Sequence, residues 1–228
     1  MDMNIPEIRS FLEHCAANPP PRPEFRFDRY RDNPRHDGEV LQVTHERYLP
    51  ALAALIAKLR PINMLTIGAL YGTLETCLLQ CHGGRDWLGT ITICDLDIPD
   101  YNANRDNGSL IYRNICGTQY GAFQRTFTHI RGSSQWPDVI AKIHAMGCYD
   151  LIFIDGEHTR EAVMRDLDTA SECVTRDGTI LVHDTELFSS SVPQGWHEWA
   201  RSNPHWRCDA VPDSTFLHGL GFVQWSNR

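Results

Sequence analysis

The chain reads Leu-Ile-Phe-Ile-Asp-Gly-Glu-His at residues 151–158, so four large apolar residues stop abruptly at two acids and a histidine. An apolar run of this length that ends in a turn signal is typical of a buried strand in a parallel sheet. The pattern returns one helix later, where residues 179–182 are apolar and His183, Asp184 and Thr185 follow. Open α/β sheets bind ligands just outside the carboxyl ends of their strands. These two strand ends therefore predict a functional site.

Strands and helices alternate along the rest of the chain. This order predicts an α/β fold with a doubly wound, mostly parallel sheet of seven strands and helices on both faces. Thr159 suits the N-cap of the helix between the two site strands, and Arg-Asp-Gly at residues 176–178 indicates the turn after that helix. The last two strands are expected to pair as an antiparallel hairpin at the sheet edge. The seven expected strands lie at residues 62–67, 90–94, 126–130, 151–154, 179–182, 206–211 and 216–225.

The N-terminal part differs in composition from the rest. We expect residues 1–38 to form a helical arm or lid and residues 39–228 to form the main domain. Residues 1–18 have the spacing of a short helix, and the proline-rich stretch that follows is either an arm along the surface or a lid over the site. A second helix is expected over residues 39–60, with Pro50 as a kink or a restart.

Composition excludes several classes of protein. A net charge of −8 over 228 residues argues against the basic surface of a nucleic-acid-binding protein. No apolar run approaches the length of a membrane span and no secretory signal pattern opens the chain, so we expect a soluble, cytoplasmic protein. The eight cysteines include no CxxC pair, which favours reduced thiols and argues against a zinc site.

A glycine turn and an acid follow the first two expected strands. Gly68 and Gly72 flank the turn after the first strand, and Asp95 closes the second. Glycine lacks a Cβ and lets backbone approach a ligand closely, although any tight strand–helix turn also favours it. An acid at the end of the second strand is the arrangement that binds a ribose hydroxyl in nucleotide-binding α/β folds. The combination predicts a cofactor that carries a ribose.

With these features in place, residues 39–185 resemble the class I S-adenosylmethionine-dependent methyltransferases, which have a Rossmann-like fold. The resemblance is closest to the small-molecule O-methyltransferases of the catechol O-methyltransferase-like and sugar O-methyltransferase groups. It implies S-adenosylmethionine as the cofactor. In that family the first strand carries an acid before the glycine turn, whereas Thr66 stands at that position here, and Leu70 replaces the usual middle glycine.

The resemblance also implies which residues contact the cofactor. Asp95 matches the ribose-binding acid, and Gly-Ser-Ser-Gln at residues 132–135 is similar to the stretch that lies beside the adenine. Tyr71, inside the glycine turn, lies either over the cofactor or against the following helix. The implied cofactor-binding residues are Gly68, Ala69, Tyr71, Gly72, Asp95, Ser134, Gln135 and Asp155.

At the two site strands the resemblance implies a divalent metal and a catalytic base. Asp155, Asp184 and Thr185 match the metal ligands, with Thr185 where the family has asparagine, and hard oxygen ligands favour Mg²⁺ or a similar cation. His158 matches the basic residue three positions after Asp155 and suits a general base for a hydroxyl. His183 is a second base, a metal ligand or a packed core histidine. Simpler interpretations are a helix-capping Asp155 and a surface His158.

The predicted function is transfer of a methyl group from S-adenosylmethionine to a hydroxyl of a small molecule, of natural-product or sugar type. The expected partner is this acceptor, with no nucleic acid and no membrane, and the N-terminal helices suit a homo-oligomer. One alternative is a catalytically silent member that binds the cofactor or a partner protein, and another is a different metal-assisted reaction on the same scaffold. A nicotinamide dehydrogenase is disfavoured, because the full GxGxxG pattern and a Tyr–Lys proton relay are missing.

Overall fold

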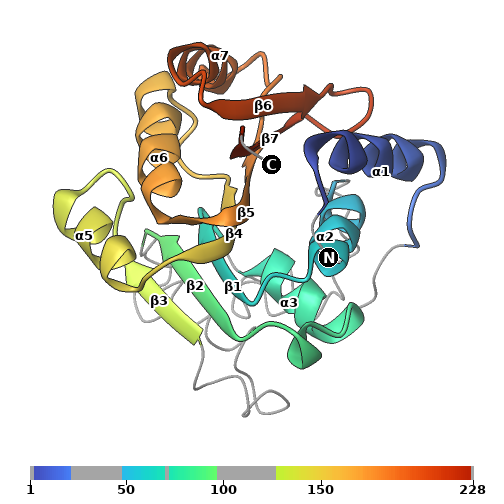
Figure 1. The fold of residues 1–228 in the computed structure, drawn as a ribbon, viewed down its shortest axis with the longest axis horizontal. Coiled ribbons are helices and arrows are strands. Elements are labelled where there is room, and N and C mark those ends of the chain that lie inside the picture. The colour runs from blue at the N-terminus through green and yellow to red at the C-terminus, as the bar shows by residue number, and fades with distance from the viewer. Residues whose placement is uncertain (1–2, 22–47, 70–71, 97–126, 227–228) are drawn as a thin grey trace, which may run out of the picture.

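The computed structural model describes residues 3–21, 48–69, 72–96 and 127–226, apart from the side chain of Arg85. Seven strands form one sheet in the order β3-β2-β1-β4-β5-β7-β6 (Figure 1). Strands β1 to β5 are parallel, and β7 runs antiparallel to β5 and β6. The predicted doubly wound sheet with a C-terminal hairpin is confirmed. The strands are β1 Asn63–Ile67, β2 Thr90–Asp95, β3 Phe127–Arg131, β4 Tyr149–Ile154, β5 Val174–His183, β6 Trp206–Val211 and β7 Leu220–Trp225.

Helices cover both faces of the sheet (Figure 1). In β4, Leu151 and Phe153 pack in the cluster that includes α1 to α3, whereas Ile152 and Ile154 pack in the cluster with α5 to α7. Side chains alternate along a strand, so an unbroken apolar run serves two cores at once. The helices are α1 Ile5–Ala17, α2 Leu49–Leu59, α3 Thr73–Cys81, α5 Pro137–Ala145, α6 Arg160–Cys173 and α7 Val192–Ser202, with a short 3₁₀ helix at Gly84–Asp86.

Local signals account for the helix starts. Thr159 Oγ1 accepts a hydrogen bond from the amide of Ala162 at 3.2 Å, which confirms the predicted N-cap of α6. Pro50 lies in the first turn of α2, where its missing N–H leaves no helical bond unmade, so it starts this helix and does not kink it. The part of that predicted helix before residue 48 lies outside the described residues.

Two predicted boundaries are wrong. Residues 176–178 belong to β5 instead of forming a turn, because the pairing of β4 with β5 shifts register between Tyr149 and Leu151. A Cβ on Gly178 would lie 2.9 Å from the carbonyl oxygen of Asp150, so glycine permits the two backbones to approach there. The last strand begins at Leu220 and not at residue 216, because Gly219 turns the chain at a φ of 78°.

The predicted N-terminal helix is present and packs on the edge hairpin. The Arg9 guanidinium donates to both carboxylate oxygens of Asp209, and also to the carbonyl oxygen of Ala210 at 2.7 Å. Of the stretch predicted as an arm or a lid, residues 18–38, only residues 18–21 are among the described residues, so the division at residue 38 stays a prediction. The described part of the chain contains no helix of the length and hydrophobicity that a membrane span requires. Within these described residues, Cys15, Cys94, Cys148, Cys173 and Cys208 are free thiols.

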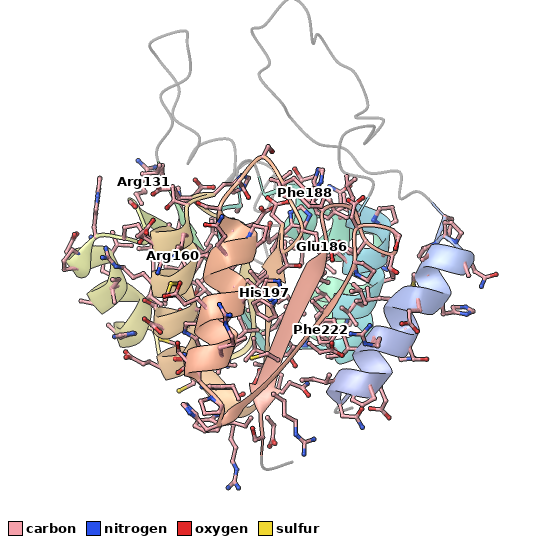
Figure 2. The ribbon with its side chains drawn as sticks, turned by 90° about the horizontal axis from the view of Figure 1, so that it is seen from above. Arg131, Arg160, Glu186, Phe188, His197 and Phe222 are labelled. Carbon is pink, nitrogen blue, oxygen red and sulfur yellow. The ribbon has the colours of Figure 1, made fainter. Side chains whose placement is uncertain are left out.

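Helices α6 and α7 lie side by side (Figures 1 and 2) and approach closely at one glycine. A Cβ on Gly195 would lie 2.3 Å from Val163 Cγ1 and 2.7 Å from the carbonyl oxygen of Arg160. We expect Gly195→Ala to lower the free energy of unfolding by about 1–3 kcal/mol, because the added methyl group forces the helices apart. Urea unfolding measures the effect. Ser202→Ala, at an exposed position of the same helix, is the control, and equal stability of both variants would contradict the close contact.

Candidate active site

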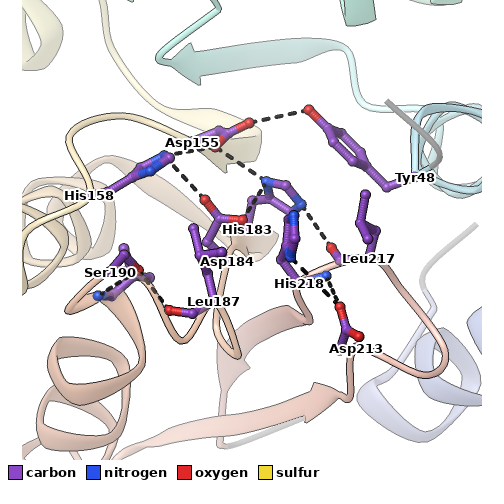
Figure 3. A network of polar contacts seen from close by, with 11 residues as sticks. Tyr48, Asp155, His158, His183, Asp184, Leu187, Ser190, Asp213, Leu217 and His218 are labelled. Carbon is purple, nitrogen blue, oxygen red and sulfur yellow. Dashed lines mark hydrogen bonds and ion pairs between the residues drawn. The ribbon is translucent and has the colours of Figure 1, made fainter. Parts of the chain in front are cut away.

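Four of the predicted site residues meet at the carboxyl ends of β4 and β5 (Figure 3). Because these strands are parallel neighbours, Asp155 after β4 and Asp184 after β5 come together. His158 Nε2 lies 3.1 Å from Asp184 Oδ2 and 3.7 Å from Asp155 Oδ1. His183 Nδ1 lies 3.3 Å from Oδ1 of each acid. Two imidazoles therefore lie against two carboxylates.

Asp184 is held in an unusual backbone conformation. Its φ is 62°, in the left-handed region that non-glycine residues seldom adopt, and it is 3% exposed. Strained backbone of this kind persists where the surrounding structure holds it, often at functional sites. The conformation turns the carboxylate back toward His158, away from the direction that the strand would continue (Figure 3).

The hydrogen bonding of His183 determines its protonation. Its Nε2 lies 3.0 Å from the carbonyl oxygen of Leu217, which only accepts, so Nε2 carries a hydrogen. Its Nδ1 then faces Asp155 and Asp184, whose ionised carboxylates also only accept, so a proton on Nδ1 is favoured. Burial lowers the pKa of His183, but the two acids outweigh it and raise the pKa above its ordinary value. The two acids thus favour the protonated form of His183.

The other three groups shift in the directions that this charge pattern requires. Burial raises the pKa of Asp155, yet the hydrogen bonds and charges of His158 and His183 bring it well below its ordinary range. Burial, with the nearby charge of Asp155, raises the pKa of Asp184. The hydrogen bond to Asp155 and the charges of both acids raise the pKa of His158, against its partial burial. His158 is the member of the cluster most open to solvent, with 48% of its side chain exposed.

Tyr48 completes the cluster, although the sequence analysis did not single it out. Its hydroxyl donates to Asp155 Oδ2 at 3.4 Å, and its ring centroid lies 4.2 Å from that of His183. It directly precedes α2, with no motif around it. Only the packing of α2 against the sheet brings it to the site.

Three residues of the cluster could hold a metal ion. Asp155, His158 and Asp184 each offer one ligand atom, and these atoms lie within 4.8 Å of one another. Two carboxylate oxygens suit Mg²⁺, Mn²⁺ or Ca²⁺, whereas an imidazole nitrogen suits transition metals better. Thr185 directly follows Asp184 in the chain. Its Oγ1 is buried, and a Cβ on Gly219 would lie 2.7 Å from it, so its side chain packs toward β7. The ligand role of Thr185 stays a prediction.

A cavity of about 500 Å³ opens beside the cluster, between the glycine turn, the end of β2 and the end of β4. This volume is in the range of cofactor sites. His158 lines it, whereas His183 does not, so only one of the two imidazoles faces a ligand in this cavity. The predicted cofactor-binding residues that line it are Gly68, Ala69, Asp95, Ser134 and Asp155.

The remaining cofactor predictions have different positions. Gly72 is the N-cap of α3 at a φ of 72° and is not part of the described cavity wall. Tyr71 lies outside the described residues. Gly68 lines the cavity, but a Cβ there would lie 2.0 Å from the carbonyl oxygen of Asp155. Position 68 therefore requires glycine because the backbone after β1 passes close to the backbone after β4.

Gln135 points away from the cavity toward α6. Its Nε2 donates to Asp166 Oδ1 at 2.9 Å and to Ser134 Oγ at 3.2 Å, and Gln135 is not among the residues that line the cavity. Asp166 is fully buried, and burial raises its pKa to about 6 despite the hydrogen bonds of Ser134 and Gln135. This acid, also missed by the sequence analysis, holds the segment that lies along the cavity.

Comparisons with known proteins agree with this architecture. A family model described as a methyltransferase domain matches residues 65–185. The SAH-bound methyltransferase PaMTH1 of Podospora anserina is 13% identical, with a TM-score of 0.60 over 99% of this chain and 91% of that one. An O-methyltransferase of Bacillus cereus in complex with SAH is 15% identical, with a TM-score of 0.58 over 98% and 92%.

A third similar structure covers a smaller part of the chain. The O-methyltransferase TomG of Streptomyces achromogenes, involved in tomaymycin synthesis and in complex with SAM, is 11% identical, with a TM-score of 0.58 over 77% and 78%. No curated protein sequence matches this chain. At these identities the solved structures show a common fold.

The raised pKa of Asp166 predicts a pH-dependent stability. A folded-state pKa of about 6 lies above the ordinary value of 3.8, so the folded state loses stability as pH rises through this interval. Between pH 5 and pH 8 the wild type should lose about 1 kcal/mol of unfolding free energy through this group. Asp166→Asn removes the titrating carboxyl and should not show this loss. Urea unfolding at both pH values measures this. Asp138→Asn, on the exposed side of α5, is the control, and the same pH dependence in all three proteins would contradict the assignment.

Proposed function

This chain belongs to the methyltransferase domain family, and from that membership we propose that it transfers a methyl group from S-adenosylmethionine to a hydroxyl of a small molecule. The observation that carries the proposal is the meeting of Asp155, His158 and Asp184 at the edge of the cavity beside the glycine turn. Two of the similar structures are O-methyltransferases in complex with SAH or SAM.

The residues of the cavity suit S-adenosylmethionine. Asp95 ends β2 on the cavity wall, where a carboxylate accepts hydrogen bonds from ribose hydroxyls. Ser134 also lines the cavity, and in this proposal it lies beside the adenine ring. The described lining includes four acids but no lysine or arginine. An acidic wall favours a ligand that carries positive charge. The cofactor supplies the reactive methyl group, so the protein has to orient the acceptor and remove its proton.

We assign the proton transfer to His158. It is the imidazole that both lines the cavity and is partly open to solvent, so an acceptor hydroxyl reaches it directly. Asp184, at 3.1 Å, orients the ring and stabilises the proton that it takes up. His183 is buried behind the acids, so in this proposal it positions Asp155 and Asp184 instead of acting as the base.

A divalent cation is a second way to activate the hydroxyl. Asp155 and Asp184 would hold it, with His158 as the nitrogen ligand, and it would lower the pKa of a bound hydroxyl and orient the acceptor. His158 cannot bind a cation and accept a proton through the same Nε2. Metal-dependent and metal-independent activity are therefore distinguishable.

The proposal also covers the acceptor, the cellular compartment and the oligomeric state. The acidic site and the net charge of −8 disfavour a nucleic acid, and the fold is similar to that of TomG, so a natural-product intermediate or a sugar remains the proposed acceptor. We expect the enzyme to act in the cytoplasm. Homo-oligomers formed through the N-terminal helices also stay a prediction. One side of α1 is already buried within the chain, so such contacts would use its exposed side.

Asp95→Ala tests the cofactor site. We expect wild type to bind S-adenosylhomocysteine with micromolar affinity, with or without Mg²⁺, and the variant to bind it roughly 10–100-fold more weakly, because hydrogen bonds to a charged acceptor are lost. Isothermal titration calorimetry measures both. Asp138→Ala on α5 is the matched control. If wild type does not bind S-adenosylhomocysteine, the proposed function fails, and if the variant binds it as tightly as wild type, Asp95 has no ribose role.

The pH dependence of methyl transfer tests His158. A base acts when deprotonated and the pKa of His158 is raised, so in EDTA kcat/KM should rise with pH through a value above 6.5. Asp184→Asn removes a negative charge beside His158, so the rise of kcat/KM should move to lower pH. His158→Gln removes the base and should lower kcat/KM by roughly 10²–10⁴. Activity that disappears in EDTA and returns with Mg²⁺ assigns the activation to a metal. Binding of the cofactor without turnover of any acceptor would favour the catalytically silent alternative.

A further inference from the structure

One of the four acids on the described cavity wall comes from an unexpected element. Glu75 lies in the first turn of α3, is fully buried and lines the cavity, although the apolar surroundings of that helix favour an apolar residue there. The hydroxyl of Thr66, in the middle of β1, donates a short hydrogen bond to Glu75 Oε1. Thr66 is the position where the resemblance implies an acid. The strand thus lacks a carboxylate, and the facing helix provides one at the same place.

The register of the sheet places this pair relative to the other acids of the cavity. Thr66 pairs with Ile93 of β2 on one side and with Phe153 of β4 on the other, and all three side chains point to the face that α3 covers. Asp95 and Asp155 stand two residues beyond Ile93 and Phe153, and therefore on the same face. The Thr66–Glu75 pair thus lies at β1, between β2, the strand of the ribose site, and β4, the strand of the reaction site.

A ligand that reaches from Asp95 to His158 must cross β1. The part of this ligand that lies near Thr66 faces the buried carboxylate of Glu75, so its charge has to be complementary to an acid. The N-terminal end of α3 partly offsets the charge of Glu75, but the described cavity wall adds Asp95, Asp155 and Glu157 and no lysine or arginine. A cationic group with hydrogen-bond donors is the chemistry that such a wall recognises. The α-ammonium group of the methionine part of S-adenosylmethionine has both properties.

We propose that Glu75, held in place by Thr66, binds the α-ammonium group of the cofactor and so replaces an acid on β1. This inference rests on the proposed function, because it requires that S-adenosylmethionine occupies the cavity. The hydroxyl of Thr66 donates to Glu75 and keeps its lone pairs for a donor from the ligand. In this proposal Glu75 on α3 supplies the negative charge, and Thr66 on β1 supplies the hydroxyl that orients it.

Calorimetry with two ligands tests the proposal. The probes are S-adenosylhomocysteine and its analogue without the α-amino group, which differ only in the ammonium. We expect wild type to prefer the amino ligand by about 10–100-fold, the range of a hydrogen bond between charged groups. Glu75→Gln should abolish that preference by weakening the amino ligand alone, because the amide still accepts from Thr66 but carries no charge. Asp138→Asn, at an exposed position of α5 outside the described cavity wall, is the control and should keep the preference.

Each outcome decides between the two claims. If wild type binds neither ligand, the proposed function fails and this inference fails with it. If wild type binds both ligands equally, or Glu75→Gln weakens both equally or neither, the proposed function stands and Glu75 has no role in binding the ammonium. If Glu75→Gln does not fold, the preference of wild type still tests the ammonium site. The double variant Thr66→Glu/Glu75→Gln returns the carboxylate to β1 and should restore the preference.

Discussion

Two carboxylates end the neighbouring strands β4 and β5, and their burial is possible because two imidazoles lie between them. An ionised acid in a protein interior costs several kcal/mol unless it is paired, and two acids together cost more. His183 contacts both Asp155 and Asp184, and its Nε2 is committed to the carbonyl of Leu217. His158 closes the cluster from the solvent side. The pairing of charge keeps the strand ends together, and the strand ends define the position of the cavity.

The same constraint separates the roles of the two histidines. A buried imidazole between two acids orients its neighbours, whereas a half-exposed imidazole on a cavity wall can exchange a proton with a ligand. Tyr48 adds to this order, since its ring packs on His183 and its hydroxyl reaches Asp155. The cluster is thus built in two layers, a buried one that balances charge and an open one that faces the acceptor.

At β1 the polar groups come from two different elements. Thr66 on β1 and Glu75 on α3 together present a hydroxyl and a carboxylate to the cavity. A carboxylate can reach this position from more than one element of the fold. A helix that packs over β1 can therefore supply the acid that the strand lacks. The glycine after that strand serves the fold as well, because at Gly68 the backbone passes too close to the carbonyl of Asp155 for any Cβ.

The sequence by itself determined the sheet and the place of the site. Apolar runs that end in Asp-Gly-Glu-His and His-Asp-Thr predict parallel strands with their polar ends at one edge, since periodicity and turn chemistry are local properties. It missed the shift of register that draws residues 176–178 into β5, because pairing depends on a neighbouring strand. It also missed Tyr48, Glu75 and Asp166, none of which lies in a motif. Only the tertiary structure decided their roles, because burial, partners and charge balance arise between elements that are distant in the chain.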